Sequence, residues 1–450
     1  AVALVLRALR ERAPQAVFVL VLASLVFYAT WNPLYLVALL ATAAVDFHVG
    51  KALATATDEG ARKRLLATSL VVDLGLLVGV KYFNTVAGLV SKEPPFSIVF
   101  AAGISFYTFQ SISYVVDVYR RDQAAETSFP RYLAFVSFFP TLLAGPITRA
   151  ETLLPQLAKP LTPFRDDLAS RGLLLIALGL LKKGLIADPL SMNLVNRVFD
   201  LPGLYSSTEV LLAIYGYAVQ IWADFSGYTD IAIGSALVLG IALKENFDRP
   251  YRSADLTEFW RRWHISLSTW LRDYVFFSLP GNRRGSKLPY LNLVITFAIG
   301  GLWHGAAWTF LVWGLLHGAG LAFLRLRADR GPRRPAPLPA WRTALGIVAT
   351  FHFVAFTWIF FRATSVANAL DVLRVLFEGT VSFANVPLTA ALALVLGLLA
   401  QAMPDAPAKK LELRFVSLPS FAQAAVLVLF ALALRLAGGT SVAPFIYTSF

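Results

Sequence analysis

Long, largely apolar stretches recur along the whole 450-residue chain. A helix needs about 20 apolar residues to cross the hydrocarbon core of a bilayer, which is about 30 Å thick. The stretches that reach or approach this length are Ala16–Tyr35, Leu65–Phe83, Phe96–Val118, Gly172–Ala187, Leu291–Leu324, Thr343–Phe361, Leu388–Met403 and Ala424–Ala437. Counting Glu209–Leu243 as two further segments, we expect roughly ten to twelve membrane helices.

Composition supports the same fold class. Hydrophobic residues make up 57% of the chain and charged residues only 15%, whereas a soluble protein needs about 25% charged residues to cover its surface. The continuous apolarity favours helices, because barrel strands would alternate polar and apolar residues. The sequence therefore predicts an all-α polytopic membrane protein. We expect a single transmembrane domain over residues 1–450, since no soluble segment is long enough to hold its own core.

The excess of basic residues is best explained by membrane topology. The net charge is +13, and two hydrophobic segments separate Arg7–Arg12 from Lys51–Arg64, and Lys51–Arg64 from Arg120–Arg131. An even number of crossings returns each cluster to the same side, which the positive-inside rule makes the cytoplasm. We therefore expect no nucleic-acid partner. The remaining charge would attract anionic lipid head groups or a polyanionic cofactor such as coenzyme A.

Two further features bound the chemistry. The chain has no cysteine, which excludes disulfides, thiolate catalysis and Cys-based metal sites. The basic start is followed by a long apolar stretch, which we interpret as a retained first span rather than a cleaved signal peptide.

His304 is the most conspicuous ionisable residue in an apolar setting. It lies in Gly300-Gly301-Leu302-Trp303-His304-Gly305, inside the 34-residue run Leu291–Leu324. That run would be about 51 Å long at 1.5 Å per residue, so it must tilt steeply or break, and the glycines are the expected place. A general base is one interpretation of the imidazole, whose pKa lies near operating pH. A buried histidine bonded to a carbonyl is the alternative.

The segment Leu256–Leu279 mixes cationic and aromatic residues, among them Trp260, Arg261, Arg262 and Trp263. Such a mixture is typical of an amphipathic or re-entrant helix at the membrane–water interface. His264 follows directly, and taken alone it is more typical of a packing or head-group residue. Ala367–Phe377 is predicted to be a second interfacial helix.

Other polar residues in apolar surroundings have simpler interpretations. His317 follows His304 by 13 positions, about 220° round one helix, so the two share no face unless the helix breaks. His48 and His352 have no motif around them, and we expect structural roles for all three. Asp224 and Asp230 either relay protons or cations or, as we favour, bond backbone groups freed by Gly227. Lys182 and Lys183 are expected to snorkel towards the interface.

Several motifs together resemble the signature of bacterial membrane-bound O-acyltransferases, from about residue 30 to the end of the chain. The motifs are Gly103–Arg120, Phe139–Thr148, Asp224–Tyr251, Phe259–Tyr274, Gly281-Asn282-Arg283-Arg284-Gly285, Gly301-Leu302-Trp303-His304-Gly305-Ala306 and Pro444-Phe445-Ile446-Tyr447. Within the family, the Gly281–Gly285 loop is most similar to the branch that acetylates alginate and other polysaccharides.

This resemblance implies a fold, a reaction and a site. The family fold is a ring of helices around a central funnel in the bacterial inner membrane. His304 matches the family's essential histidine and His264 its second recurring histidine, so both are predicted to be catalytic. Acetyl-CoA would be the cytoplasmic donor, with Arg261 and Arg262 holding its phosphates, and no metal is expected.

The resemblance also implies partners, and it leaves alternatives open. The acceptor would be an exopolysaccharide hydroxyl, or a hydroxyl of a periplasmic SGNH-type acetyltransferase. The same site would also suit D-alanyl or longer-chain acyl transfer. From a different class, a proton-coupled transporter would use His304 and the two aspartates as a relay, and a scaffold would only anchor an extracellular acetyltransferase.

Overall fold

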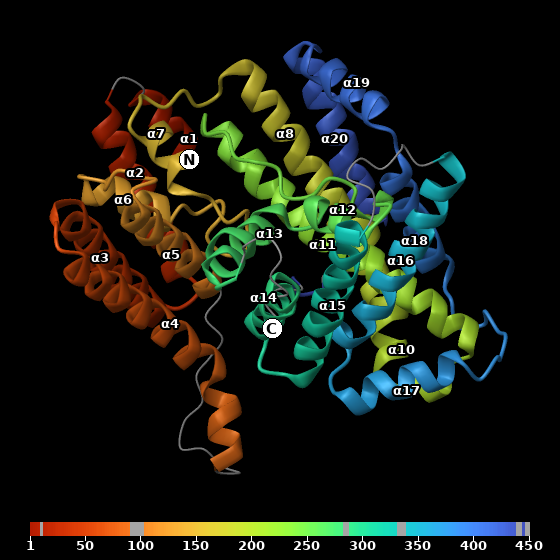
Figure 1. Ribbon diagram of the computed structural model, residues 1–450. Coiled ribbons are helices and arrows are strands. Elements are labelled where there is room, and N and C mark those ends of the chain that lie inside the picture. The colour runs from red at the N-terminus through yellow and green to blue at the C-terminus, as the bar shows by residue number, and fades with distance from the viewer. Residues whose placement is uncertain (10–11, 91–102, 282–287, 331–338, 438–442, 446–450) are drawn as a thin grey trace. The chain divides into compact units, whose positions relative to one another are not determined.

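A computed structural model of the chain describes residues 1–9, 12–90, 103–281, 288–330, 339–437 and 443–445. Within these residues the regular elements are helices and no strand occurs, which confirms the all-α class (Figure 1). Three predicted features lie partly outside the described residues: the start of Phe96–Val118, Asn282–Gly285 of the predicted loop, and Ile446 and Tyr447 of the last motif.

The chain divides into two compact units, which we call the N-terminal unit (Ala1–Ile176 with Thr229–Glu245) and the C-terminal unit (Ala177–Tyr228 with Asn246–Phe450). The helices of the N-terminal unit are α1 (Val2–Ala8), α2 (Ala13–Ala29), α3 (Pro33–Thr55), α4 (Glu59–Val90), α5 (Ile104–Arg120), α6 (Phe129–Val136) and α7 (Ala150–Leu157). Two helices contribute residues to both units, α8 (Asp166–Leu181) and α11 (Ser207–Val238).

The C-terminal unit contains the remaining elements. They are η1 (Lys182–Ala187), α9 (Asp188–Leu190), η2 (Ser191–Val195), α10 (Asn196–Asp200), η3 (Pro202–Leu204), η4 (Pro250–Arg252), α12 (Leu256–Arg262), α13 (Ile265–Trp270), η5 (Leu271–Val275), η6 (Phe276–Ser278), α14 (Leu288–His304), α15 (Trp308–Arg330), α16 (Ala340–Arg362), α17 (Val366–Leu376), α18 (Leu388–Ala402), α19 (Asp405–Val416) and α20 (Ser420–Ala437). The predicted helix at Ala367–Phe377 is thus present as α17.

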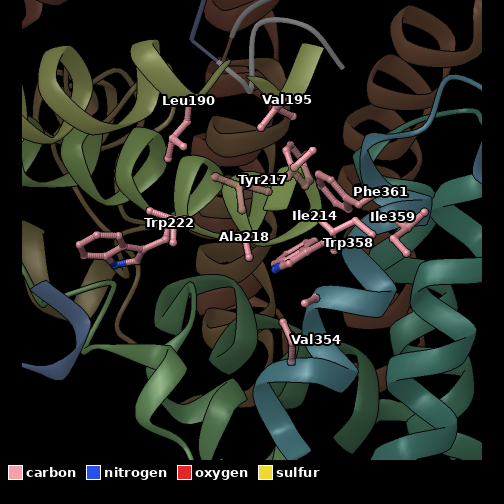
Figure 2. Close-up of a cluster of buried hydrophobic side chains, with 14 of the residues drawn as sticks. Leu190, Val195, Ile214, Tyr217, Ala218, Trp222, Val354, Trp358, Ile359 and Phe361 are labelled. Atoms are coloured by element: carbon pink, nitrogen blue, oxygen red, sulfur yellow. The ribbon is translucent and has the colours of Figure 1, made fainter. Parts of the chain in front are cut away.

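Buried aromatic residues build the core of the C-terminal unit. Side chains of α11 and α16 meet there, with Trp358 lying beside Ala218 and Ile214 (Figure 2). The Trp358 Nε1–H donates to the hydroxyl of Tyr251 at 3.2 Å, and that hydroxyl donates to the carbonyl of Ala218 at 2.6 Å. Large aromatic residues therefore fill the core while their polar atoms stay hydrogen-bonded.

Several helices of the described chain suit a bilayer. By length and composition, four can cross a membrane, namely α3, Glu59–Gly88 of α4, α15 and α16, and the bent pair of α18 and α19 would make five. The helices α2, α14 and α20 are apolar but shorter. These helices make the chain a multi-pass membrane protein, whereas the count of ten to twelve spans and their arrangement around a funnel stay predictions.

The long apolar run around His304 breaks where its glycines predicted. Helix α14 ends at His304 and α15 begins at Trp308, and the two helices lie side by side (Figure 1). A Cβ atom on Gly301 would overlap the carbonyl oxygen of Phe310, and one on Gly314 would overlap the carbonyl oxygen of Phe297. These glycines therefore serve the close approach of two backbones.

We predict that Gly301→Ala destabilises the protein and Gly75→Ala does not. The new methyl group at Gly301 meets a backbone carbonyl that has little freedom to move, and such overpacking costs about 1–3 kcal/mol. Nothing lies within 4 Å of a Cβ at Gly75 in α4, so alanine there stabilises the helix by roughly 0.5–1 kcal/mol. Thermal unfolding of the detergent-solubilised protein measures both, and equal stability of the two variants would contradict the packing.

Candidate active site in the C-terminal unit

His304 lies inside the C-terminal unit, at the last residue of α14, and its side chain is only 4% exposed. Aromatic rings surround the imidazole, with centroid distances of 4.8 Å to Trp303, 4.8 Å to Phe361, 5.2 Å to Trp313 and 6.2 Å to Phe310. The helix break turns α15 back against α14, which brings Phe310 and Trp313 onto the ring. The imidazole is therefore held in a water-poor aromatic environment.

His264 is fixed by its backbone and by one asparagine. It joins α12 to α13 in the left-handed conformation, with φ 41° and ψ 57°, and its side chain is 1% exposed. The Oδ1 atom of Asn246 accepts from the Ser266 N–H at 3.0 Å and from the Ser266 hydroxyl at 2.9 Å, and lies 3.3 Å from His264 Nδ1. These bonds hold a turn that a non-glycine residue rarely adopts.

The same contacts define the protonation of His264. Because Asn246 Oδ1 only accepts hydrogen bonds, Nδ1 is the donor, and Nε2 carries the lone pair of the neutral ring. The two helices that flank His264 have seven and six residues, too short to span a membrane. Burial lowers the pKa of His264 to about 3, so the ring is neutral at physiological pH.

The predicted catalytic histidines belong to one continuous series of ring contacts. Trp303 lies 6.5 Å from His264 and 4.8 Å from His304, and Trp313 lies 5.2 Å from His304 and 5.0 Å from His317. We call these five residues the ring series. The spacing argument separated His304 from His317 only for an unbroken helix, and the break places them on two helices whose faces meet.

His317 has its two ring nitrogens occupied by neighbouring side chains. The Trp260 Nε1–H donates to Nδ1 at 3.2 Å, so the proton of the imidazole is on Nε2, which donates to the Thr357 hydroxyl at 2.9 Å. The side chain is fully buried. This is the arrangement of a structural histidine.

The other two histidines also have structural surroundings. His352, outside the ring series, bonds the Val348 carbonyl at 2.7 Å and the Tyr215 hydroxyl at 2.8 Å. His48, in the N-terminal unit, packs its ring against Phe47.

The segment Leu256–Leu279 differs from the predicted interfacial helix in one respect. Its tryptophans Trp260, Trp263 and Trp270 are 5%, 2% and 5% exposed, so they pack within the core instead of facing an interface. The helix is interrupted at Trp263 and His264, which separates it into the two short helices α12 and α13.

Arg261 and Arg262, the predicted donor contacts, are not equivalent. The Arg262 guanidinium pairs with Glu258 at 2.9 Å and with Asp248 at 3.0 Å. Arg261 is exposed, and no ion pair involves it among the residues that the structure describes. Of these two arginines, therefore, only Arg261 has a charge that is not engaged in an ion pair within the described residues. In the part of the chain that the structure describes, no group of three or more His, Asp or Glu side chains is placed to hold a metal ion.

The prediction that Lys183 snorkels is wrong. Its Nζ atom lies 2.9 Å from a carboxylate oxygen of Asp188 and 2.9 Å from one of Asp224. The pairing follows from the cost of leaving any of these charges alone in a buried setting. It gives Asp224 a cationic partner that its sequence context did not indicate. Lys182 instead lies over the Trp222 ring at 5.1 Å, and Asp230 lies in the part of α11 that belongs to the N-terminal unit.

The Lys183 ion network also holds a C-terminal segment next to His264. The Ala443 N–H donates to Asp188, and Lys183 donates to the Pro444 carbonyl at 3.5 Å. Phe445 stacks on Tyr228 with centroids 4.6 Å apart and lies 6.2 Å from Phe225. Phe225 in turn meets the His264 ring edge-on at 4.7 Å. Sequence reasoning missed this network, because residues 41 positions apart, such as Lys183 and Asp224, leave no spacing signal.

Comparison with known proteins identifies the family. The profile of MBOAT, the membrane-bound O-acyltransferase family, matches residues 120–364, which include both candidate histidines. The chain belongs to this family.

Three relatives illustrate the range of the family. The chain is 38% identical over 377 residues to the probable alginate O-acetylase AlgI of Azotobacter vinelandii, covering 81% of this chain and 72% of the relative. It is 35% identical over 386 residues to the peptidoglycan O-acetyltransferase of Helicobacter pylori (79% and 72%), and 32% over 286 residues to the teichoic acid D-alanyltransferase of Bacillus subtilis (60% and 70%). The chain is therefore a membrane O-acyltransferase, and the resemblance that its motifs indicated is confirmed.

We predict that Asn246→Ala impairs the site and that Asn246→Asp changes its pH dependence. Alanine removes the acceptor that holds the His264 turn, which costs about 1–3 kcal/mol of stability and lowers turnover. Aspartate keeps an acceptor but adds a negative charge that raises the pKa of His264. As the pH is lowered, His264 therefore becomes protonated and activity is lost at a higher pH than in the wild-type protein. Acyl transfer measured from pH 5 to 8 tests both, and unchanged profiles for both variants would contradict the role of Asn246.

Lys182 and Lys183 offer a matched pair of neighbours. We predict that Lys183→Gln leaves Asp188 and Asp224 unpaired, destabilises the protein by about 3–5 kcal/mol and exposes the segment around Pro444 to protease. Lys182→Gln removes the contact with the Trp222 ring, which is worth about 0.5–2 kcal/mol. Thermal unfolding and limited proteolysis compare the two. Equal sensitivity of both variants would argue against the network.

Proposed function

We propose that this chain acetylates hydroxyl groups outside the bacterial inner membrane, using acetyl-CoA from the cytoplasm. Two named relatives support an acetyl group and a glycan acceptor, the probable alginate O-acetylase and the peptidoglycan O-acetyltransferase. The observation that carries the proposal is His304, which lies at the helix break within the family match and is enclosed by aromatic rings.

In the proposed reaction His304 acts as general base. It takes the proton of the acceptor hydroxyl as the oxygen attacks the thioester carbonyl, and the tetrahedral intermediate then collapses with loss of the C–S bond. The imidazolium returns the proton to the departing thiolate, so the products are an ester and free coenzyme A. The aromatic surroundings exclude water, which protects the thioester from hydrolysis.

The two substrates approach from opposite sides of the membrane. Coenzyme A is too polar to cross a bilayer, so its pantetheine arm has to reach the site from the cytoplasm while the acceptor arrives from outside. Arg261 is the residue we assign to the donor phosphates, because Arg262 is committed to Glu258 and Asp248. The acceptor is an exopolysaccharide, or the hydroxyl of a periplasmic SGNH-type acetyltransferase that passes the acetyl group on.

His264 is the second catalytic candidate. Its Nε2 lone pair and its contact with Trp303, the residue before His304, support a role in orienting substrate or in a second proton transfer. The bonds to Asn246 hold the ring in one orientation, as a residue that acts on a positioned substrate requires.

One alternative donor has an observation in its favour. The likeness to the teichoic acid D-alanyltransferase of Bacillus subtilis supports D-alanyl transfer by the same site. A panel of acetyl-CoA, longer acyl-CoA thioesters and a D-alanyl carrier protein, given to the purified protein, separates these donors by the rate of thioester consumption.

We predict that His304→Ala lowers acetyl transfer by about 10²–10⁴-fold while the protein still folds and keeps its abundance in the membrane. His352→Gln is the matched control, because His352 lies outside the ring series and bonds Tyr215. Release of coenzyme A from acetyl-CoA measures the rate. Full activity of His304→Ala would overturn the proposal, and proton flux through sealed vesicles without acyl turnover would favour a transporter.

A further inference from the structure

Two carboxyl groups meet inside the N-terminal unit, which contains none of the residues assigned to acyl transfer. Asp46 lies in α3 and Asp73 in α4, and both are fully buried. Ser69, one helical turn before Asp73 on α4, donates its hydroxyl to Asp46 at 2.6 Å, which places the two carboxyl groups next to each other. Both helices are long and apolar enough to span a membrane, and they lie side by side with α5 (Figure 1). A pair of acids in such a setting needs a physical explanation.

The groups that face the pair are neutral. The Ser69 hydroxyl of α4 donates to Asp46 Oδ1 at 2.6 Å, and Ser111 of α5 also hydrogen-bonds to Asp46. From α5 and α6, the titratable side chains that face the pair are tyrosines, namely Tyr107, Tyr114 and Tyr132.

The lysine of α3 and the arginine of α6 are engaged elsewhere, and Lys81 of α4 follows Asp73 by eight positions, about two helical turns along the axis. Lys51 of α3 lies over the Phe47 ring at 5.6 Å. Arg131 of α6 pairs with Glu126 at 2.6 Å. Among the residues that the structure describes, no salt bridge neutralises either aspartate.

Several oxygens around the pair have no protein donor. Both carboxyl oxygens of Asp73 and Oδ2 of Asp46 are buried and accept no hydrogen bond from the described residues. The hydroxyl of Tyr107, a residue only 1% exposed that interacts with Asp73, is also without a partner in this part of the chain. Two buried carboxylates that are both charged and lack donors are strongly unfavourable, so the site holds something that supplies positive charge.

We propose that Asp46 and Asp73 form a proton-binding site, in which the two carboxyl groups hold one proton between them at neutral pH. Two adjacent carboxyl groups that are buried in a low dielectric do not both ionise, so one of them keeps a proton that it can donate to the other. The proton binds as O–H···O⁻ without any redox or covalent change in the protein. It joins α3 to α4 within the N-terminal unit, whereas the histidines assigned to catalysis belong to the C-terminal unit.

Infrared spectroscopy of the purified full chain tests this site directly. We expect the spectrum of the wild-type protein minus that of Asp73→Asn at pH 7 to contain the C=O band of one protonated carboxylic acid, which shifts in D₂O. Asp46→Asn removes the same band, and the double variant removes no more than either single variant. Asp371→Asn is the control, because Asp371 is 55% exposed beside Arg374 and loses no such band.

Three outcomes would overturn the proposal. Absence of the band in the wild-type protein means that both acids are ionised, and ²²Na⁺ binding that is lost in Asp73→Asn would then assign the site to a metal cation. Loss of two bands in the double variant means that each acid holds its own proton. If the asparagine variants do not fold, an alkaline titration of the wild-type protein alone must still remove one acid band, and failure to do so overturns the assignment.

Discussion

The close approach of α14 and α15 is the constraint on which the candidate site depends. Gly301 and Gly314 leave room for a carbonyl of the opposite helix, so the two backbones come nearer than side chains would allow. This contact closes the turn after His304 and brings Phe310 and Trp313 against its ring. A larger residue at either glycine would separate the helices and open the aromatic enclosure to water.

The second histidine is held by a different device. His264 adopts a left-handed backbone conformation between two short helices, and Asn246 compensates by accepting from the residue two positions later and from the imidazole itself. Strained conformations of this kind persist when the surrounding structure enforces them, and they cluster at functional sites. One histidine is thus placed by helix packing and the other by a hydrogen-bonded turn, with Trp303 in contact with both.

The buried charges of the C-terminal unit are paired with one another. Lys183 lies between Asp188 and Asp224, and this small network also binds the backbone of Ala443 and Pro444. Phe445 then packs beside Phe225, which contacts His264. Phe445 therefore supports the surroundings of His264, which lies about 180 positions earlier in the sequence. Only folding brings two such distant segments together.

The sequence by itself determined the all-α membrane class, the family and the helix break at the glycines around His304. Apolar length, motif identity and glycine spacing are local properties of the chain. It also singled out His304 and His264. Only the tertiary structure decided that His317 joins their ring series, that Arg262 is committed to Glu258 and Asp248, and that Lys183 turns inwards. Each of these depends on residues that are distant in sequence, and burial makes such charged and polar groups find partners that no local pattern encodes.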